Sequence, residues 1–333
     1  MGSVVAPGPD ARDGFTRMTL DILIPTFNRC SDLAKNVRLL NTLIEEEGSG
    51  LSCRILVSNN CSEDDTASTL ELLQSEVQTE LIVFNQTENL GGEGNVIFLL
   101  HQATAERVMI VGDDDFLPRG YLREVIRLLE RSPELRAIIP GIASLYCDGN
   151  VVPERNERFD SRLYPAGHSS VRAISYLGHQ ISGIVFMRQG MLDAYLTEPS
   201  LRNLYPTVFF LGYSCENGQV VYLPKLKVLI SQDNQKYWNY DASGLLSEIF
   251  RNYQLLYPRR PFLRLSMCLS VMIKQPTRLS FRMSPLYAVP AFFHLLFAPG
   301  VDPLVRLVLP VLFPVLYVRR IFRFLLRRIG WLR

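Results

Sequence analysis

Short apolar runs alternate with helical patterns over the first 110 residues, and this alternation limits the possible folds more than any other feature of the chain. The apolar runs are residues 19–27, 53–60, 80–85 and 107–111. Each has the length of a strand that is covered on both faces. Between them apolar residues recur at helical spacing, as at Leu33, Val37 and Leu40. The pattern predicts an α/β fold with a parallel sheet and right-handed crossovers.

Polar and glycine residues predict where the first helices begin and end. Ser31 and Ser62 stand where a serine could cap the first two helices by accepting a hydrogen bond from a first-turn amide. Gly48 is expected to end the first helix, and Gly92 to begin the third. Further apolar runs at 135–142, 182–187 and 219–230 could complete the same sheet.

Charge is distributed unevenly along the chain. The whole sequence carries a net charge of +2, but the segment from Arg251 onward carries +13, which leaves −11 for the first 250 residues. We therefore predict three parts: a disordered leader over residues 1–17, an α/β catalytic domain over residues 18–242, and a basic, helical, membrane-associating region over residues 243–333. The leader lacks the positive start and apolar core of a signal peptide, so we expect no export.

The cysteines also indicate that the protein is not exported. The six of them, at positions 30, 53, 61, 147, 215 and 268, form neither a CxxC pair nor a Cys/His cluster with zinc spacing. Free thiols in a reducing cytoplasm are the preferred interpretation.

Three consecutive aspartates, Asp113, Asp114 and Asp115, follow the fourth apolar run. Like charges in a partly buried site disfavour one another's ionised form, so the cluster needs solvent or a cation. Mg²⁺ and Mn²⁺ prefer carboxylate oxygens and often share their coordination shell with substrate phosphates. The alternative is a solvated turn whose acids cap the next helix. Because ligands of parallel sheets bind beyond the carboxyl ends of the strands, a metal site is favoured.

Polar and glycine-rich loops follow the second and third apolar runs. Asn59, Asn60 and Asp64 could hydrogen-bond the edge of a base, although an Asx turn with a helix cap explains them equally well. The glycines of residues 85–95 permit close approach of the backbone to a ligand, and the asparagines there can fix the loop. This stretch matches neither GxGxxG nor GxxxxGK(S/T), which argues against dinucleotide and P-loop binding.

The motifs ILIPTFNR, LVSNNCSEDDT, NQTENLGGEGN and MIVGDDDFLPRGYL occur in this order between about Leu20 and Tyr121. Together they resemble the family 2 glycosyltransferases. A looser likeness, to members that build bacterial surface polysaccharides, continues to about Tyr240. The resemblance implies a GT-A (Rossmann-like) fold with a mainly parallel central sheet. It also implies inverting transfer of a hexosyl or deoxyhexosyl group from a nucleoside diphosphate sugar.

The same resemblance implies roles for particular residues. Pro25, Thr26 and Asn60 would line the nucleoside pocket, and the three aspartates would hold the diphosphate through Mn²⁺ or Mg²⁺. Alignment on Gly120 makes Asp114 and Asp115 the metal-proximal pair, whereas plain DxD spacing uses Asp113 and Asp115. Separately, the segment SQDNQKYW could close over the donor, with Lys236 at a phosphate and Trp238 on the sugar, whereas a solvated lysine and a partly buried tryptophan are the alternatives. The expected nucleotide-sugar site comprises Pro25, Thr26, Asn28, Arg29, Asn60, Asn89, Gly91, Asn95, Asp113, Asp114, Lys236 and Trp238.

Inverting transfer also needs a base that deprotonates the acceptor hydroxyl. Here the chain departs from the family, because Tyr205–Thr207 stands where an acidic pair usually opens a helix. His179, Asp193 and Glu198 are the candidate bases, each with an ordinary structural role as the alternative.

The carboxyl-terminal region contains apolar stretches that prolines interrupt, which makes a simple transmembrane helix doubtful. Its last segment repeats apolar residues at helical spacing opposite Arg319, Arg320, Arg323 and Arg327. Residues 319–333 therefore predict a basic amphipathic helix on an anionic membrane surface. The alternative is a helix packed on the domain with solvated arginines. The region is strongly apolar and carries no nucleic-acid motif, so we expect no nucleic-acid partner.

These observations favour a peripheral enzyme at the cytoplasmic face of a membrane that extends a lipid-linked or polysaccharide acceptor. A nucleotidyltransferase of related fold would need a glycine-rich basic loop after the first strand, and PTFNRCSDL offers none. The missing acidic pair leaves open a membrane-associated sugar-nucleotide-binding protein without transferase activity.

Overall fold

The computed structural model describes residues 18–153, 160–232, 245–275 and 285–328. Its first half contains the elements β1 (Met18–Thr26), α1 (Cys30–Glu47), β2 (Leu51–Asn59), α2 (Thr66–Glu76), β3 (Glu80–Asn85), α3 (Gly91–Gln102) and β4 (Arg107–Ile110). The strands pair in parallel in the order β3-β2-β1-β4. Their carboxyl ends therefore lie at one edge of the sheet, and the predicted α/β fold is confirmed.

The second half of the chain completes the same sheet. Its elements up to residue 231 are β5 (Asp115–Phe116), α4 (Tyr121–Arg131), β6 (Ala137–Leu145), β7 (Val151–Pro153), β8 (Arg162–Tyr164), α5 (His168–Ile174), the 3₁₀ helix η1 (Ser175–His179), β9 (Ile184–Met187), α6 (Met191–Tyr195), the 3₁₀ helix η2 (Pro199–Leu201), α7 (Pro206–Asn217) and β10 (Val220–Ser231). The described strands follow the order β3-β2-β1-β4-β9-β6-β10-β5, with β7 on β6 and β8 on β10.

Strand β9 is antiparallel to both of its neighbours, β4 and β6. Its first residue, Ile184, pairs with Ile110 at the end of β4. The chain before β9 is thereby brought to the edge where the parallel strands end. Strand β10 is parallel to β6 and antiparallel to the short β5. This pairing places Asp115, the last residue of the acidic loop (Asp113–Asp115), beside Ile230 near the end of β10.

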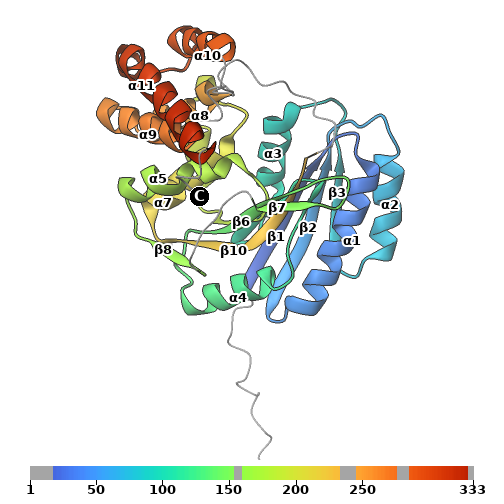
Figure 1. Ribbon diagram of the computed structural model, residues 1–333. Coiled ribbons are helices and arrows are strands. Elements are labelled where there is room, and N and C mark those ends of the chain that lie inside the picture. The colour runs from blue at the N-terminus through green and yellow to red at the C-terminus, as the bar shows by residue number, and fades with distance from the viewer. Residues whose placement is uncertain (1–17, 154–159, 233–244, 276–284, 329–333) are drawn as a thin grey trace, which may run out of the picture.

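Helices cover both faces of the sheet (Figure 1). Alternate residues of a strand point to opposite faces. On β1, Ile22 and Ile24 belong to the buried cluster that includes residues of α1, α2 and α4. Leu23 belongs to the cluster on the other face, with residues of α3, α5 and α7. Burial on both faces explains why the strands are nearly continuous apolar runs.

The helix caps differ from the sequence prediction. Ser31 lies inside the first turn of α1, which begins at Cys30, and α2 begins only at Thr66, so neither Ser31 nor Ser62 is an N-cap residue. Asp64 serves both helix starts instead, because its carboxylate accepts from the Cys30 amide at 3.1 Å and from the Thr66 amide at 3.1 Å. Gly48 is the C-cap of α1, as predicted.

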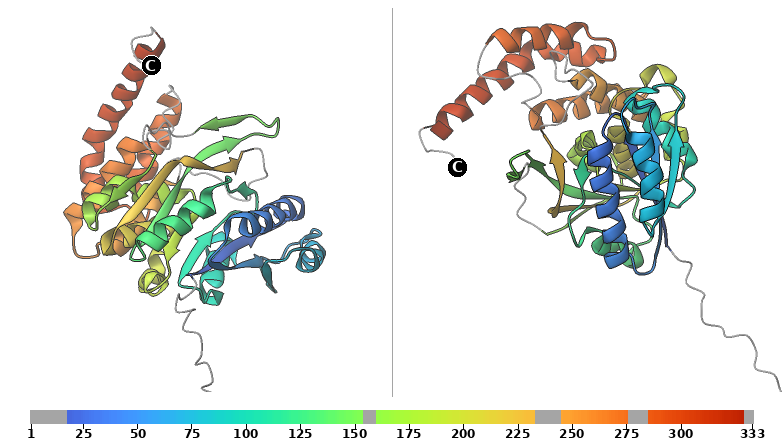
Figure 2. Two further views of the ribbon diagram at one scale, coloured as in Figure 1. Left: turned by 90° about the horizontal axis from the view of Figure 1, so that it is seen from below. Right: turned by 90° about the vertical axis from the view of Figure 1, so that its right-hand side faces the viewer.

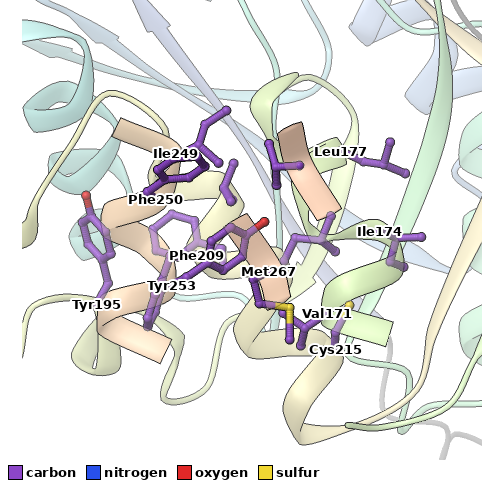
Figure 3. Close-up of a cluster of buried hydrophobic side chains, with 14 of the residues drawn as sticks. Val171, Ile174, Leu177, Tyr195, Phe209, Cys215, Ile249, Phe250, Tyr253 and Met267 are labelled. Carbon is purple, nitrogen blue, oxygen red and sulfur yellow. The ribbon is translucent and has the colours of Figure 1, made fainter. Parts of the chain in front are cut away.

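Helices α8 (Leu246–Leu256) and α9 (Pro261–Lys274) pack against the domain through large apolar side chains. Figure 3 shows this cluster, in which Phe250 and Tyr253 of α8 and Met267 of α9 lie beside Phe209 of α7 and Val171 of α5. The predicted domain boundary at 242/243 falls in the segment 233–244, outside the described residues, and stays a prediction.

Helices α10 (Pro285–Phe297) and α11 (Pro303–Arg328) follow as the outermost layer (Figure 2). Pro310 and Pro314 lie inside α11 without ending it, contrary to the expected interruption. Both prolines are exposed, so the carbonyls that lose their helical donors can face water. None of the helices described is both long and apolar enough to cross a membrane.

Candidate functional site

The loops that follow β1, β2 and β3 meet at the carboxyl edge of the sheet. The Asn60 amide donates to the Thr26 carbonyl at 2.9 Å, and the Gln86 amide donates to the Asn59 carbonyl at 2.9 Å. These bonds continue the parallel pairing beyond the strand ends. They hold the three polar loops next to one another as a single rim.

Asp113 lies in this rim, buried and bonded to two groups of the first loop. The Thr26 hydroxyl donates to its Oδ2 at 2.8 Å, and Arg29 Nη1 donates to its Oδ1 at 2.9 Å. The same Arg29 nitrogen lies 2.7 Å from Asp114 Oδ2. One guanidinium thus compensates two neighbouring carboxylates. The sequence left the source of the compensating positive charge open between solvent and a cation, and in the structure Arg29 supplies part of it.

Asp115 is held by a different part of the chain. Its Oδ2 accepts from the Ser182 hydroxyl, and its Oδ1 accepts from the Ser231 amide at 3.3 Å. The Ser182 hydroxyl oxygen also accepts from the Gly112 amide at 2.9 Å. A Cβ atom on Gly112 would lie 2.8 Å from Asp115 Oδ2, so a side chain there would displace the Asp115 carboxylate. The antiparallel course of β9 is what delivers Ser182 to this position.

Burial changes the acidity of these carboxyl groups. It raises the pKa of Asp113 to about 6, although Arg29 opposes the rise, and the charge of Asp114 adds to it. Burial also raises the pKa of Asp115 to about 7, and the charge of Asp114 again adds to the shift. The Arg29 guanidinium does not fully offset the cost of ionising the loop. A further cation next to these carboxylates would favour their ionised form.

The predicted nucleotide-binding asparagines interlock around the same rim. Asn60 Nδ2 donates to Asn89 Oδ1 at 2.8 Å, and Asn89 Oδ1 also accepts from the Gly91 amide at 2.8 Å. Asn28, which has a positive φ of 53°, accepts from the Glu63 amide at 2.8 Å through its Oδ1. Asn95 is buried in α3 and donates to the Ser58 carbonyl at 3.0 Å. The structure therefore brings these four asparagines to neighbouring loops.

Two other residues predicted to bind the nucleotide sugar, Pro25 and Gly91, also lie at the rim. Pro25 pairs in register with Ser58 near the end of β1, at the rim. Gly91 opens α3 with a φ of 72°, and a Cβ there would meet nothing within 4 Å. Lys236 and Trp238 belong to the segment 233–244, which lies outside the described residues.

The three candidate bases lie in different places. His179 ends η1, three residues before Ser182, and its Nδ1 lies 2.6 Å from the Tyr176 carbonyl oxygen. Asp193 follows the end of β9, where Met187 pairs with Arg107 at the amino end of β4, away from the acidic loop. Glu198 is exposed and accepts from the Ser200 hydroxyl at 2.8 Å. Of the three, only His179 belongs to the chain segment that leads directly into the rim.

Helix α7 begins at Pro206, where the family pattern expects an acidic pair. Thr207 is buried, and its hydroxyl donates to the Gly178 carbonyl at 2.5 Å. The start of α7 therefore lies against the residue that precedes His179. If Tyr205–Thr207 corresponds to the acidic pair of the family, as expected from the sequence, no carboxylate is supplied at the start of α7.

Sequence analysis missed Ser182, Ser231 and Asn36 as parts of the site. Asn36 lies fully buried on α1, and its Nδ2 donates to the Gly112 carbonyl at 2.8 Å. A polar residue beside Val37 on the apolar face of a predicted helix was the available signal for Asn36. No local pattern marks the two serines, since they reach Asp115 only through the sheet.

The donor set suits a hard divalent cation shared with a ligand. No group of three or more His, Cys, Asp or Glu side chains that could hold a metal ion occurs in the part of the chain that the structure describes. Mg²⁺ commonly takes only one or two protein carboxylates and completes its shell with water and substrate phosphates. Asp113, in the turn after β4, and Asp115, the first residue of β5, carry carboxylate oxygens of this kind.

Comparison with known proteins adds a family match. The family model described as Glycosyl transferase family 2 matches residues 21–191. One curated relative is GalNAc(5)-diNAcBac-PP-undecaprenol beta-1,3-glucosyltransferase of Campylobacter jejuni, 30% identical over 135 residues, which are 40% of this chain and 41% of that protein. Another is abequosyltransferase RfbV of Salmonella typhimurium, 29% identical over 105 residues, which are 32% of this chain and 31% of that protein. The match thus spans less than half of either relative.

Solved structures resemble the fold over most of the chain. Residues 1–349 of TarS from S. aureus superpose with a TM-score of 0.63 at 15% identity, covering 91% of this chain and 87% of that one. The same TarS fragment in complex with UDP-GlcNAc superposes with a TM-score of 0.63 at 14% identity and the same coverage. At this identity the likeness shows the fold alone, and it agrees with the expected GT-A architecture.

Proposed function

Because the chain belongs to glycosyl transferase family 2, we propose that it transfers a hexosyl or deoxyhexosyl group from a nucleoside diphosphate donor to an acceptor hydroxyl, with inversion and with the help of Mn²⁺ or Mg²⁺. The observation that carries the proposal is the acidic loop at the carboxyl edge of the sheet. There Asp113 and Asp115 are buried, oriented by hydroxyl groups, and only partly compensated by Arg29.

Each residue of the loop has a definite task in this proposal. Asp113 and Asp115 would hold the cation, which would supply positive charge to stabilise the departing diphosphate. Thr26 and Ser182 keep the two carboxylates in position through their hydroxyl groups. Arg29, which pairs with Asp113 and Asp114, would exchange these partners for a phosphate oxygen of the donor. The loops of Asn60, Asn89 and Gly91 provide the surface for the nucleoside.

We assign the base to His179. A carbonyl oxygen only accepts, so the contact with the Tyr176 carbonyl requires a proton on Nδ1 and makes Nε2 the basic nitrogen in the neutral ring. His179 also lies next to Gly178, which contacts the start of α7 where the acid of the family is replaced. In the reaction Nε2 takes the acceptor proton, the acceptor oxygen bonds to the anomeric carbon, and the bond from that carbon to the diphosphate breaks.

The names of the relatives guide the proposed substrates. One curated relative acts on an undecaprenol-linked glycan, and TarS has been solved with UDP-GlcNAc. We propose by analogy a nucleotide sugar as donor and a lipid-linked or polysaccharide glycan as acceptor. Such an acceptor would place residues 18–242, the proposed catalytic domain, at the cytoplasmic face of a membrane.

One observation favours a second candidate. Tyr205–Thr207 stands where the resemblance to the family leads us to expect an acidic pair, and a protein that binds a sugar nucleotide without transferring it would show the same rim. Loss of donor turnover with retained donor binding would identify that function.

Thermal unfolding with a panel of nucleotide sugars, with and without Mn²⁺, tests the proposal. A ligand that binds only the folded protein raises the unfolding temperature. We expect one or a few donors to do so with Mn²⁺ present, and Asp115→Asn to abolish both this shift and sugar transfer. Asp160→Asn, at an exposed position paired with Lys225, is the matched control and should behave as wild type. Unchanged donor shift and turnover in Asp115→Asn would refute the metal-binding role.

A further inference from the structure

Helix α11 exposes a continuous line of apolar side chains, here called the apolar ridge: Leu307, Val311, Val315, Val318, Phe322 and Leu325. Each is between 50% and 75% exposed. Their spacings of three and four residues keep them on one side of a helix with 3.6 residues per turn. At 1.5 Å per residue the ridge is about 27 Å long.

The opposite face of α11 is already used for packing. Val305, Leu309, Phe313 and Leu316 are at most 6% exposed and belong to the buried cluster that also contains residues of α7 and α9. Helix packing therefore explains the inner face but not the apolar ridge. A monomeric protein rarely exposes so long an apolar surface without a partner.

Helix α10 widens the exposed apolar surface. Val289, Phe293 and Phe297 recur at every fourth position and are 51% to 70% exposed. An apolar groove is lined from α10 by Val289 and Phe293 and from α11 by Pro310 and Pro314, which directly precede Val311 and Val315 of the apolar ridge. Figure 2 shows α10 and α11 as an outer layer, with the end of α11 projecting beyond the body of the molecule.

The charges around this surface are almost entirely positive. Arg319 and Arg323 are exposed on α11, next to the apolar ridge. From residue 251 to the end the sequence contains a single acid, Asp302. Asp302 is buried, lies 2.6 Å from Arg264 Nε, and accepts from the Leu304 amide at 3.0 Å. No carboxylate of this region is therefore left to repel an anionic surface.

We propose that α10 and α11 form a membrane-docking surface that lies flat on an anionic bilayer. The apolar ridge and the exposed phenylalanines enter the boundary between headgroups and acyl chains, and Arg319 and Arg323 lie at the level of the lipid phosphates. The sequence pattern placed the amphipathic contact at residues 319–333 and left open whether residues 285–318 reach the bilayer. The surface begins 30 residues earlier, at Val289.

A bilayer fits this surface better than a second copy of the chain. Rows of exposed apolar side chains along two helices can sink into lipid over their whole length, whereas a stable dimer needs a broad complementary patch on the partner. Two copies meeting along the ridge would also bring their arginine rows together without acids to pair them.

Flotation of the full-length protein with vesicles tests the proposal. Wild type should float with phosphatidylcholine vesicles that contain phosphatidylglycerol. The triple variant Val311→Ser/Val318→Ser/Phe322→Ser should bind at least tenfold more weakly, because each side chain loses the gain from leaving water. The double variant Leu72→Ser/Leu163→Ser, at residues 62% and 54% exposed elsewhere, is the matched control and should float as wild type does.

Three further readouts keep the outcomes distinct. Thermal unfolding should show the triple variant folded, since the changed side chains are exposed. Equal vesicle binding by wild type and triple variant would overturn the proposal. So would a dimer in light scattering that the triple variant dissociates, with no vesicle binding by wild type. The proposal does not rest on sugar transfer: Asp115→Asn should float normally, so failure of the proposed reaction and failure of docking are separate results.

Discussion

The acidic loop at the sheet edge and the apolar ridge on α11 both contain side chains in unfavourable surroundings, carboxylates that are buried and apolar groups that are exposed, but only the carboxylates have partners among the described residues. In the loop, buried carboxylates are each bonded within the chain, by Arg29, Thr26, Ser182 and Ser231. On the ridge, the apolar side chains and the arginines beside them are turned outward, and none of the contacts described compensates them.

The difference indicates what a ligand does in each region. At the loop, a cation and a diphosphate would take over bonds that the chain now makes for itself, so binding is an exchange of partners. At the ridge, a bilayer would cover a surface that the chain leaves in water. Changes in the loop should therefore alter chemistry and stability together, whereas changes on the ridge should alter location alone.

The largest expected effect lies at the sheet edge and concerns the base. His179→Gln should lower the rate of sugar transfer by roughly 10²–10⁴-fold, the usual contribution of a general base, and leave the donor-induced thermal shift intact. Asp193→Asn and Glu198→Gln are controls that should keep wild-type rates. Full activity of His179→Gln, or loss of activity in either control, would show that His179 is not the base.

The variant Arg29→Met tests whether a ligand at the acidic loop replaces bonds that the loop carboxylates make within the chain. Without the guanidinium, nucleotide-sugar affinity should fall by up to roughly a hundredfold, the value of a charge-assisted hydrogen bond to phosphate. Binding of Mn²⁺ alone should become tighter, because no internal cation competes for Asp113 and Asp114. Calorimetric titration with Mn²⁺ and then with donor separates the two effects.

Arg29→Lys serves as the control. Because it keeps the positive charge, its affinities for Mn²⁺ and for the nucleotide sugar should lie between those of wild type and Arg29→Met. If Arg29→Met bound Mn²⁺ more weakly than wild type, the role of Arg29 would be to order the acidic loop rather than to compete with the metal ion for its carboxylates.

Local sequence patterns were sufficient to predict the first part of the fold. Apolar runs of strand length and helical spacing predicted β1 to β4 and the edge where Asp113 and Asn60 lie. They could not predict that β9 runs antiparallel between β4 and β6, because that pairing joins residues far apart in the chain. Ser182 and Ser231 are 67 and 116 residues from Asp115, so their roles followed only from the assembled sheet.

The carboxyl-terminal region shows a different limit. The helical repeat of Val318, Phe322 and Leu325 was visible in the sequence. Pro310 and Pro314 indicated an interruption, and this prediction was wrong because both prolines face outward on a continuous α11. Which apolar residues stay exposed depends on how α11 packs on its neighbours, and periodicity alone cannot give that.

The ridge should respond to charge in a way that the loop does not. Arg319→Gln/Arg323→Gln removes two arginines, each worth about 1 kcal/mol at an anionic surface, so vesicle binding should weaken by about thirtyfold. Binding to neutral vesicles and the rate with a soluble acceptor should be unchanged. Arg119→Gln, at an exposed position on the domain, is the matched control. Equal loss on neutral and anionic vesicles would contradict an electrostatic contribution.

The smallest expected effect is a dependence of stability on pH that belongs to the loop alone. An ordinary aspartate has a pKa of about 3.9, while that of Asp115 is raised to about 7 by burial. Between these values the folded protein holds a proton that the unfolded chain releases, so raising the pH favours unfolding. In the absence of metal, wild type should therefore lose stability as the pH rises from 5 to 7. Asp115→Asn should lose less, because its amide does not ionise.

Urea unfolding of both proteins across this pH range measures the difference, and the triple ridge variant should follow the wild-type slope. Mn²⁺ with a nucleoside diphosphate should bind more tightly as the pH rises, since it needs the ionised carboxylates. Parallel slopes for wild type and Asp115→Asn would mean that the loop is already fully compensated. The acidic loop and the apolar ridge would then differ only in polarity. There would be no reason to expect a metal ion at the loop in addition to Arg29.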